Sequence, residues 1–211
     1  MTAPAPPRRR SELVRRLERI PPFPRPRPEL EQVATPAAAA AELLYEALGR
    51  GDIEDRSVLD LGSGTGRLAI GAAWLGARSV RAIEVDPAAV SIARATTRTL
   101  GLPVEFEEGA VADVAGTAVD TVVMNPPFGA QRRGADRPFW DAAFRRARGA
   151  IYAFALSDSR TFIAHRAVER GAHVESNRPI AWELPRIFPH HRRTTVRLAV
   201  DLWAIRIGPP P

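Results

Sequence analysis

The chain has 211 residues, of which 45% are hydrophobic and 26% charged, a size that suits one α/β domain with a sizeable core and does not comfortably hold two. It contains no cysteine, which excludes a disulfide scaffold, a thiolate nucleophile and a zinc site built on cysteine. All 30 basic residues are arginine, and the charge is uneven: residues 1–28 carry +6, residues 29–144 carry −7 and residues 145–200 carry +7. Two basic ends around an acidic middle favour a polyanion held by the ends, with ordinary solvated surfaces as the alternative.

The first 28 residues predict a basic, proline- and arginine-rich arm that precedes the domain proper at residues 29–211. Residues 1–9 have the composition of a disordered segment. Ser11 is a candidate N-cap for a short helix, whose apolar side is formed by Leu13, Val14, Leu17 and Ile20. The five prolines between positions 21 and 28 exclude a helix there and predict an extended chain.

From Thr35 onward, helices and strands alternate in the prediction. Thr35 and Pro36 have the residue types of a helix N-cap and a first helical position, and this helix is expected to end at Gly49. Strands are then predicted over 58–61, 80–85, 104–106, 119–124, 150–156 and in the alternating segment 195–207, with helices ending at Trp74, spanning 87–100, lying around 139–147 and spanning 159–170. This order predicts an α/β fold with a Rossmann-like, doubly wound, mostly parallel sheet covered by helices.

A glycine-rich turn follows the first predicted strand. Residues 58–66 read Val-Leu-Asp-Leu-Gly-Ser-Gly-Thr-Gly, and glycine lets the backbone turn tightly and lets a ligand approach it closely. The spacing differs from the GxGxxG of dinucleotide enzymes. It resembles motif I of S-adenosylmethionine-dependent methyltransferases, whose cofactor carries an ammonium and a carboxylate but no pyrophosphate. We expect Asp60 to orient the loop and help hold the ammonium, and amides at the helix start to take the carboxylate.

A second acidic position follows the next strand. Glu84 comes eighteen residues after Gly66, where an acid accepts hydrogen bonds from both ribose hydroxyls of such a cofactor. Asp86 is expected to cap the helix that begins at Pro87. The order of Asp60, the glycine turn and Glu84, each beside a strand, is a strong signal only when the three are taken together.

The position that usually reads the adenine of the cofactor departs from the pattern. An acid often follows the third strand in this class, and Ala110 stands there instead. The backbone at Ala110 and Val111 is expected to contact the ring. Asp113 is a possible substitute for the missing acid, with a solvated loop carboxylate as the alternative reading.

The segment Asn125-Pro126-Pro127-Phe128 ends a buried strand, and it resembles motif IV of enzymes that methylate a planar, conjugated nitrogen. Two consecutive prolines fix the backbone and present carbonyl groups. Oδ1 of Asn125 and the Pro126 carbonyl would each accept one hydrogen of an adenine amino group, which aims the nitrogen lone pair outward. Phe128 would stack on a flipped or unpaired base. Positioning and electrostatics then supply most of the rate, and the alternative is a simple strand terminator.

Over most of its length, from about Ser11 to Ile207, the chain resembles the archaeal and eukaryotic methyltransferases that form N6-methyladenosine in small-subunit ribosomal RNA. The resemblance implies a seven-stranded class I methyltransferase fold and S-adenosyl-L-methionine as cofactor. Residues 30–35, Leu-Glu-Gln-Val-Ala-Thr, are similar to the Glu-Gln-Tyr-Pro-Thr stretch of this family. The cofactor-binding residues implied by the motifs and the family together are Gln32, Thr35, Asp60, Gly62, Gly64, Thr65, Gly66, Arg67, Glu84, Ala110 and Val111.

The resemblance also implies an RNA-binding loop near the C-terminus. Trp182-Glu183-Leu184-Pro185 leads to Phe188-Pro189-His190-His191-Arg192-Arg193, similar to a basic, histidine-containing loop of the family. Arg192 and Arg193 would contact phosphates, and Phe188 and His191 would stack on bases. A polar loop without function is the alternative for the two histidines. We expect no bound metal, because no acid or cysteine shows ligand spacing around them.

A partner protein is the last implication. Eukaryotic members of the family, and several archaeal ones, pair with a small zinc-binding activator protein that adds a strand at the edge of the sheet. Here the short strand 104–106, followed by Glu107 and Glu108, is the expected edge.

Three alternatives to a methyltransferase of ribosomal RNA remain open from the sequence. The same chemistry could act on transfer RNA or DNA adenine, or on a glutamine of a release factor. A non-catalytic RNA-binding module could retain the fold. We expect a cytoplasmic protein, since no run is apolar enough for a membrane span and the start of the chain lacks the apolar core of a signal peptide.

Overall fold

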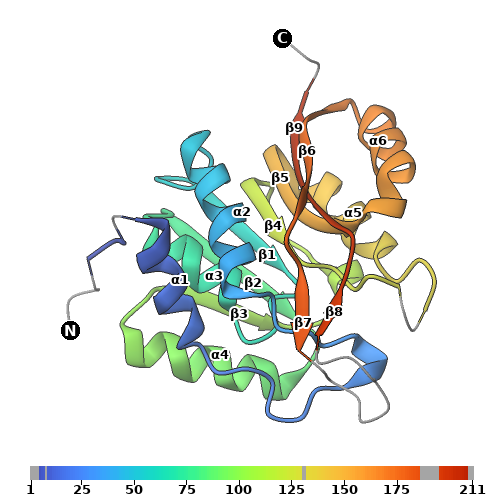
Figure 1. Ribbon diagram of the computed structural model, residues 1–211. Coiled ribbons are helices and arrows are strands. Elements are labelled where there is room, and N and C mark those ends of the chain that lie inside the picture. Colours follow the sequence, from blue (N-terminus) through green and yellow to red (C-terminus); the bar gives the residue numbers. More distant parts are fainter. Residues whose placement is uncertain (1–4, 8, 130–131, 186–194, 209–211) are drawn as a thin grey trace.

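The computed structural model describes residues 5–7, 9–129, 132–185 and 195–208, and its centre is a seven-stranded sheet in the order β3-β2-β1-β4-β5-β9-β6 (Figure 1). β1 to β5 are parallel, and β9 pairs antiparallel with both β5 and β6. The strands are β1 (Ser57–Leu61), β2 (Ser79–Glu84), β3 (Val104–Glu108), β4 (Val119–Met124), β5 (Ala147–Leu156), β6 (Ala172–Ile180) and β9 (Val200–Ile207). The predicted doubly wound, mostly parallel sheet is therefore confirmed.

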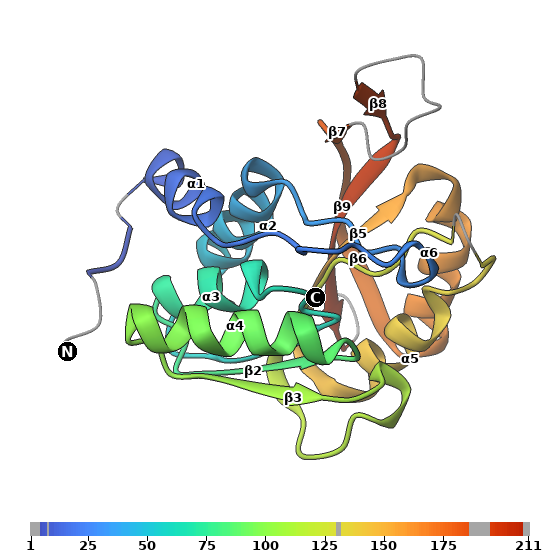
Figure 2. The same cartoon turned by 90° about the horizontal axis from the view of Figure 1, so that it is seen from below.

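Helices cover the two faces of this sheet in separate layers (Figure 2). The first layer is α1 (Arg10–Glu18), α2 (Ala37–Gly49), α3 (Arg67–Trp74) and α4 (Pro87–Leu100); the second is α5 (Arg137–Arg146) and α6 (Arg160–Glu169). Side chains alternate across each strand, so Val58 packs in the first layer and its neighbour Leu59 in the second. The described residues also form short 3₁₀ turns, η1 (Pro28–Leu30), η2 (Val111–Asp113) and η3 (Ser157–Ser159).

The helix starts that we predicted from capping residues were wrong in two places. α1 begins at Arg10, before Ser11, and no side chain caps it. α2 begins at Ala37 with Pro36 as its N-cap residue, again without a side-chain hydrogen bond, because the hydroxyl of Thr35 is bonded elsewhere, to Asn125. The cap predicted at Asp86 is confirmed, since its Oδ1 accepts a hydrogen bond from the Ala88 amide at 3.0 Å.

The C-terminal third differs most from the prediction. β6 was not predicted, and the expected strand 195–207 is two strands, β8 (Thr195–Arg197) and β9. β8 pairs antiparallel with β7 (Glu183–Pro185) in a separate two-stranded sheet. Since β9 runs antiparallel to both of its neighbours, β6 is parallel to β1–β5, and the β7–β8 hairpin extends beyond the carboxyl edge of the main sheet (Figure 1).

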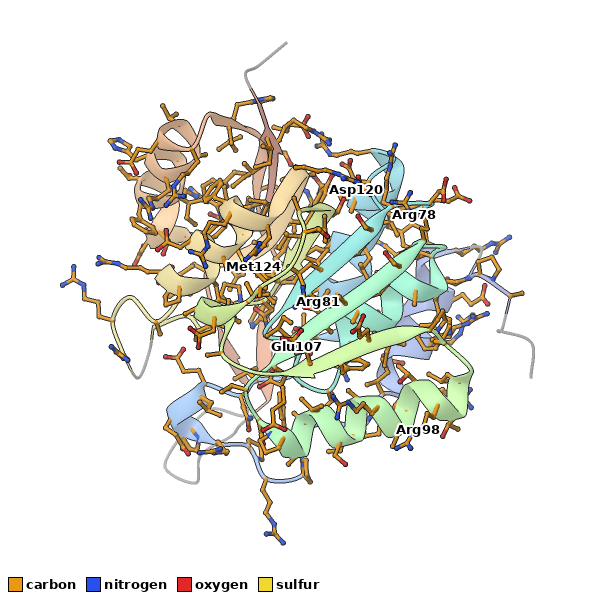
Figure 3. The ribbon with its side chains drawn as sticks, turned by 180° about the vertical axis from the view of Figure 1, so that it is seen from behind. Arg78, Arg81, Arg98, Glu107, Asp120 and Met124 are labelled. Carbon is orange, nitrogen blue, oxygen red and sulfur yellow. The ribbon has the colours of Figure 1, made fainter. Side chains whose placement is uncertain are left out.

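The opposite, amino edge of the sheet is held together by ion pairs. Asp120 at the start of β4 accepts hydrogen bonds from the Ser57 amide at 2.8 Å and from the guanidinium groups of Arg78 at 3.1 Å and Arg148 at 2.8 Å (Figure 3). Burial alone would raise the pKa of Asp120, but the bonds from Ser57 and Arg148 outweigh it and hold the pKa well below its usual range. These charges therefore stabilise the amino edge of the sheet. In open α/β sheets, ligands bind at the opposite edge, where the strands have their carboxyl ends.

Candidate functional site

A cavity of about 460 Å³ opens at the carboxyl ends of β1, β2 and β4. Residues 19–36, which link α1 to α2, pass across this edge of the sheet and form one wall (Figure 2). The wall includes these residues singled out from the sequence: Gln32, Thr35, Asp60, Gly62, Gly64, Thr65, Arg67, Glu84, Ala110, Val111, Asn125 and Pro127. Strand ends that are far apart in the sequence are thus brought together around one space.

The glycine turn after β1 needs glycine for two reasons. Gly62 and Gly64 have φ angles of +71° and +55°, which favour glycine. A Cβ on Gly64 would also lie 2.7 Å from Cζ of Phe23, and one on Gly62 would lie 2.6 Å from Cε1 of Phe139. The absence of a side chain at Gly62 and Gly64 therefore lets the rings of Phe139 and Phe23 pack against the loop at the cavity. Gly66 does not line the cavity, and a Cβ there would meet Phe106 at 2.9 Å.

Asp60 has a carboxylate oxygen that forms no hydrogen bond with any described residue. Its Oδ2 accepts a hydrogen bond from the Ala69 amide at 2.9 Å, whereas Oδ1 is buried without a hydrogen-bond partner in the described part of the chain. Burial raises the pKa of Asp60 to about 8, and the nearby carboxylate of Glu84 adds to the rise against the opposing effect of the Ala69 bond. A buried acceptor of this kind is costly unless a donor reaches it. A cationic ligand group would fit here.

Glu84, at the end of β2, is the second acid of the cavity. Its Oε2 accepts from the Gly64 amide at 2.7 Å and its Oε1 from the Asp86 amide at 3.0 Å. Burial raises the pKa of Glu84, while these amide bonds oppose the rise. A carboxylate has about four lone-pair positions, so both oxygens can still accept a bond from a hydroxyl group on a ligand.

The segment before α2 is fastened over the cavity at several points. Gln32 donates from Nε2 to Oδ2 of Asp86 at 2.6 Å, and Oε2 of Glu31 accepts from the Gly129 amide at 3.0 Å. The guanidinium of Arg67 donates to the Thr35 carbonyl, and burial lowers the pKa of Arg67. Its Nε is buried without a hydrogen-bond partner among the described residues. An anionic group in the cavity would find a donor there.

Asn125 lies where β4 ends and is held in one orientation. Its Nδ2 donates to Oγ1 of Thr35 at 3.0 Å. Its Oδ1 is buried and accepts no hydrogen bond from any described residue. The amide thus has its donor side anchored and its acceptor side available, on the wall of the same cavity as Asp60.

Phe128 and Pro126 are not on the cavity wall. Pro126 is buried. The half-buried ring of Phe128 meets Trp182 edge-on at 5.5 Å between centroids, and Trp182 meets Phe154 of β5 at 4.9 Å. Trp182 therefore braces Phe128 from the segment that joins β6 to β7. Sequence reasoning assigned no role to Trp182, although the stretch Trp-Glu-Leu-Pro was noted.

Several predicted features fall elsewhere. Asp113 is exposed in η2 and does not line the cavity, so it does not replace the missing acid at Ala110. The predicted RNA-binding residues Phe188, His191, Arg192 and Arg193 lie outside the described residues. Within the described ranges no group of three or more metal-ligating side chains is arranged to hold a metal ion, and no helix there is long and apolar enough to cross a membrane.

Comparison with known proteins places these features in a family context. The model of the family described as "Methyltransferase small domain" matches residues 37–151. The rRNA N(6)-adenosine-methyltransferase Mettl5 of Drosophila melanogaster is 32% identical over 193 residues, which cover 88% of this chain and 91% of that protein. The Danio rerio protein of the same description is 31% identical, covering 94% of this chain and 98% of the relative.

A solved structure agrees with these sequence relatives. A crystal structure from Pyrococcus horikoshii, provisionally described as an RNA methyltransferase, superposes with a TM-score of 0.88 at 38% identity. The match covers 95% of this chain and 98% of that one. The match therefore extends over nearly the whole length of both chains.

Proposed function

This chain belongs to the methyltransferase small domain family and, within it, to the rRNA N(6)-adenosine-methyltransferases, and from that membership we propose that it methylates the N6 amino group of an adenine in small-subunit ribosomal RNA. The methyl donor is S-adenosyl-L-methionine. One observation carries the proposal. Asp60 and Asn125 line the same cavity, and the Oδ1 atom of each is buried without a hydrogen-bond partner among the described residues.

The cavity suits each end of the donor. Oδ1 of Asp60 would accept from its ammonium, and the free Nε of Arg67 with the amides that begin α3 would take its carboxylate. Glu84 would accept from the ribose hydroxyls, and the backbone at Ala110 and Val111 would lie against the adenine. When bound, S-adenosyl-L-methionine supplies a methyl group attached to a positively charged sulfur, which makes that carbon electrophilic.

The catalytic corner acts on the target amine. The lone pair of an adenine amino nitrogen is delocalised into the ring, which makes it a poor nucleophile. Oδ1 of Asn125 and the Pro126 carbonyl would each accept a hydrogen bond from one N–H of the amino group and draw the nitrogen out of the ring plane. Pro127 keeps this corner rigid, and Phe128, braced by Trp182, stacks on the base. Preorganised acceptors and orientation carry the rate.

The direct experiment combines purified protein, labelled S-adenosyl-L-methionine and small-subunit RNA, followed by digestion and mass spectrometry of the nucleosides. We expect N6-methyladenosine at one site with this protein and none without it. Label found in transfer RNA, DNA or a release-factor glutamine in place of ribosomal RNA would refute the proposed acceptor. Failure to bind S-adenosyl-L-methionine by calorimetry would refute the enzymatic proposal altogether and favour a binding module.

Thr35→Val should reduce turnover because the valine side chain keeps the shape of Thr35 and cannot anchor the Asn125 amide. A freed amide can rotate and point its Nδ2 at the target amine, which it would repel. We expect kcat to fall roughly three- to ten-fold, the range of one lost hydrogen bond, with Thr35→Ser close to the wild type. Cofactor affinity, measured by calorimetry, separates this loss from a weakened pocket. Equal kcat for the valine and serine variants would contradict the role.

We also propose that the small zinc-binding activator expected from the sequence docks on β3. β3 is at the edge of the sheet, with β2 as its partner (Figure 3). The Gly109 amide donates to the Glu84 carbonyl toward β2, so by alternation the Glu108 amide points outward, available to an added strand. A groove lined by α4 and β3 residues lies beside this edge.

Glu108→Pro should therefore weaken heterodimer formation, because proline lacks the outward N–H. Glu108→Ala removes the same charge and keeps the amide, so it serves as the matched control. We expect the proline variant to bind the purified activator on the order of ten-fold more weakly and the alanine variant to bind like the wild type, by analytical ultracentrifugation. Equal affinity of the wild type and both variants would place the activator elsewhere.

The cytoplasmic location expected from the sequence remains a prediction.

A further inference from the structure

The arginines of this protein divide sharply by whether their guanidinium groups have partners. Within the described residues, most arginines bond a carboxylate or a backbone carbonyl, as Arg81 does with Glu107 (Figure 3), or lie against an aromatic ring, as Arg137 does with Phe162. A small set is exposed and makes neither kind of contact in the described part of the chain. Its members are Arg9, Arg10, Arg15, Arg19, Arg25, Arg132 and Arg133.

These unpaired arginines are not scattered. Arg9 is the N-cap residue of α1, and four more lie on α1 and the extended segment after it, which leads toward the cavity mouth (Figure 2). Arg25 is two residues from Phe23, which lines the cavity, and Arg132 lines it as well. The unpaired guanidinium groups therefore follow the chain from the far end of α1 to the entrance of the active site. We call this set the arginine track.

A groove of about 500 Å³ lies along the track between α1 and α4. Its walls include Arg16, Arg19 and the hydroxyl-bearing Thr96 and Thr99, and its floor includes the ring of Trp74. Arg16 lies over that ring at 5.8 Å from its centroid and is paired with Glu12 at 2.6 Å. Arg19 remains unpaired at the same groove, so the concave part of the track keeps a positive charge that no described acid neutralises.

The spacing on α1 favours the binding of an anion. Arg15 and Arg19 are four residues apart, which places them as neighbours on one helix face. Like charges at that spacing repel each other weakly. Of the two acids on α1, Glu12 bonds Arg16 and Glu18 is exposed. A phosphate group beside Arg15 and Arg19 would reduce their repulsion.

We propose that the arginine track binds the phosphate backbone of the RNA strand that flanks the target adenine. Guanidinium groups match phosphate geometry through paired N–H donors, and phosphate contacts fix the register of a nucleic acid without reading its sequence. The proposal rests on the proposed function, since it assumes RNA as the substrate. It adds a second contact surface to the RNA-binding residues predicted near the C-terminus.

The test is a triple variant, Arg15→Gln with Arg19→Gln and Arg25→Gln, in the full-length protein. The control variant removes the same charge away from the track through Arg56→Gln, Arg98→Gln and Arg145→Gln, three exposed arginines that bond only backbone carbonyls in the described part of the chain. Both are assayed for binding of a fluorescently labelled single-stranded fragment of the small-subunit RNA, by anisotropy over a series of salt concentrations. Thermal unfolding checks that both variants fold.

We expect the track variant to bind at least ten-fold more weakly at physiological salt. The slope of log K against log salt should fall by about 0.7 for each lost phosphate contact, or about 2 in all. The control should keep the wild-type slope. Equal loss in both variants would overturn the proposal in favour of a general charge effect. No loss in either variant would overturn it as well, because the RNA would then bind elsewhere. The track variant could instead bind free RNA like the wild type and bind assembled small subunits more weakly. That result would overturn the proposal in favour of an acidic protein surface as the partner of the track.

This outcome is distinct from a failure of the proposed function. If the protein does not methylate ribosomal RNA, the wild type itself yields no N6-methyladenosine, whatever the slopes are. If the track proposal alone fails, the wild type methylates RNA and the track variant binds it with an unchanged slope. The two readouts are independent because anisotropy requires no methyl transfer.

Discussion

Asn125→Ala is expected to abolish measurable methyl transfer while leaving the affinity for S-adenosyl-L-methionine within a few-fold of the wild type. The substitution removes Oδ1, the buried acceptor that no described residue uses. Loss of one preorganised group that stabilises a transition state costs on the order of 10²–10³ in rate. Here the loss is larger in practice, because the amino group also loses its orientation toward the donor.

Two measurements check this prediction on the same protein samples. Calorimetry gives the affinity for the cofactor, and mass spectrometry of single-turnover reactions gives the rate of transfer. A large loss of cofactor binding with retained turnover would contradict the assigned role and move Asn125 into the cofactor pocket proper. Thermal unfolding provides the control for folding, since Asn125 also anchors Thr35 at 3.0 Å.

Asp60→Asn is expected to weaken cofactor binding on the order of 10- to 100-fold, the range of one hydrogen bond between charged groups. The asparagine keeps an oxygen for the Ala69 amide, which Asp60 now bonds at 2.9 Å. Its amide nitrogen would then face the cofactor ammonium, donor against donor. The variant is nearly isosteric, so a general collapse of the pocket is not the cause of the loss.

The same substitution is expected to change how stability and cofactor affinity depend on pH. In the free protein, burial raises the pKa of Asp60 from 3.8 to about 8. The stability that its neutral form contributes is therefore fully present below pH 3.8 and is lost as the pH rises through about 8. An ammonium group beside Oδ1 favours the charged form, so binding near pH 6 releases a proton and cofactor affinity rises with pH toward 8.

Calorimetry in buffers of different ionisation enthalpy measures that proton. We expect release of close to one proton near pH 6 for the wild type and much less for Asp60→Asn. In thermal unfolding we expect the wild type to lose stability between pH 4 and 8 and the variant to lack that loss. An identical proton release in both proteins would show that another group titrates on binding and would remove Asp60 from the ammonium site.

The central sheet was predictable because most of its strands have a clear apolar sequence pattern. The strands around Val58, Val80 and Val122 are buried on both faces and read as short apolar runs between glycines and helices. β6 was missed because it lies at an edge, where its residues are mostly half-exposed and its sequence is polar. Local residue types alone could not reveal a strand that depends on β9 for its pairing.

The site was predictable where it is made of strand ends. Asp60, Glu84 and Asn125 end parallel strands, so their convergence on one cavity follows from the topology. The contacts of Phe23 and Glu31 were not foreseen, because the proline-rich segment has no periodicity that fixes where it lies. Residue type alone predicts a helix cap at Thr35 and the family resemblance predicts a cofactor contact, but neither predicts its bond to an amide ninety residues away, which depends on the tertiary fold.

The stretch from Phe23 to Thr35 has two structural roles. It lines the cavity, and it forms hydrogen bonds with Asn125 and Gly129, which follow β4. Any displacement of this stretch would therefore change the shape of the cavity and the support of the Asn125 amide together. The two halves of the site are coupled through one short piece of backbone.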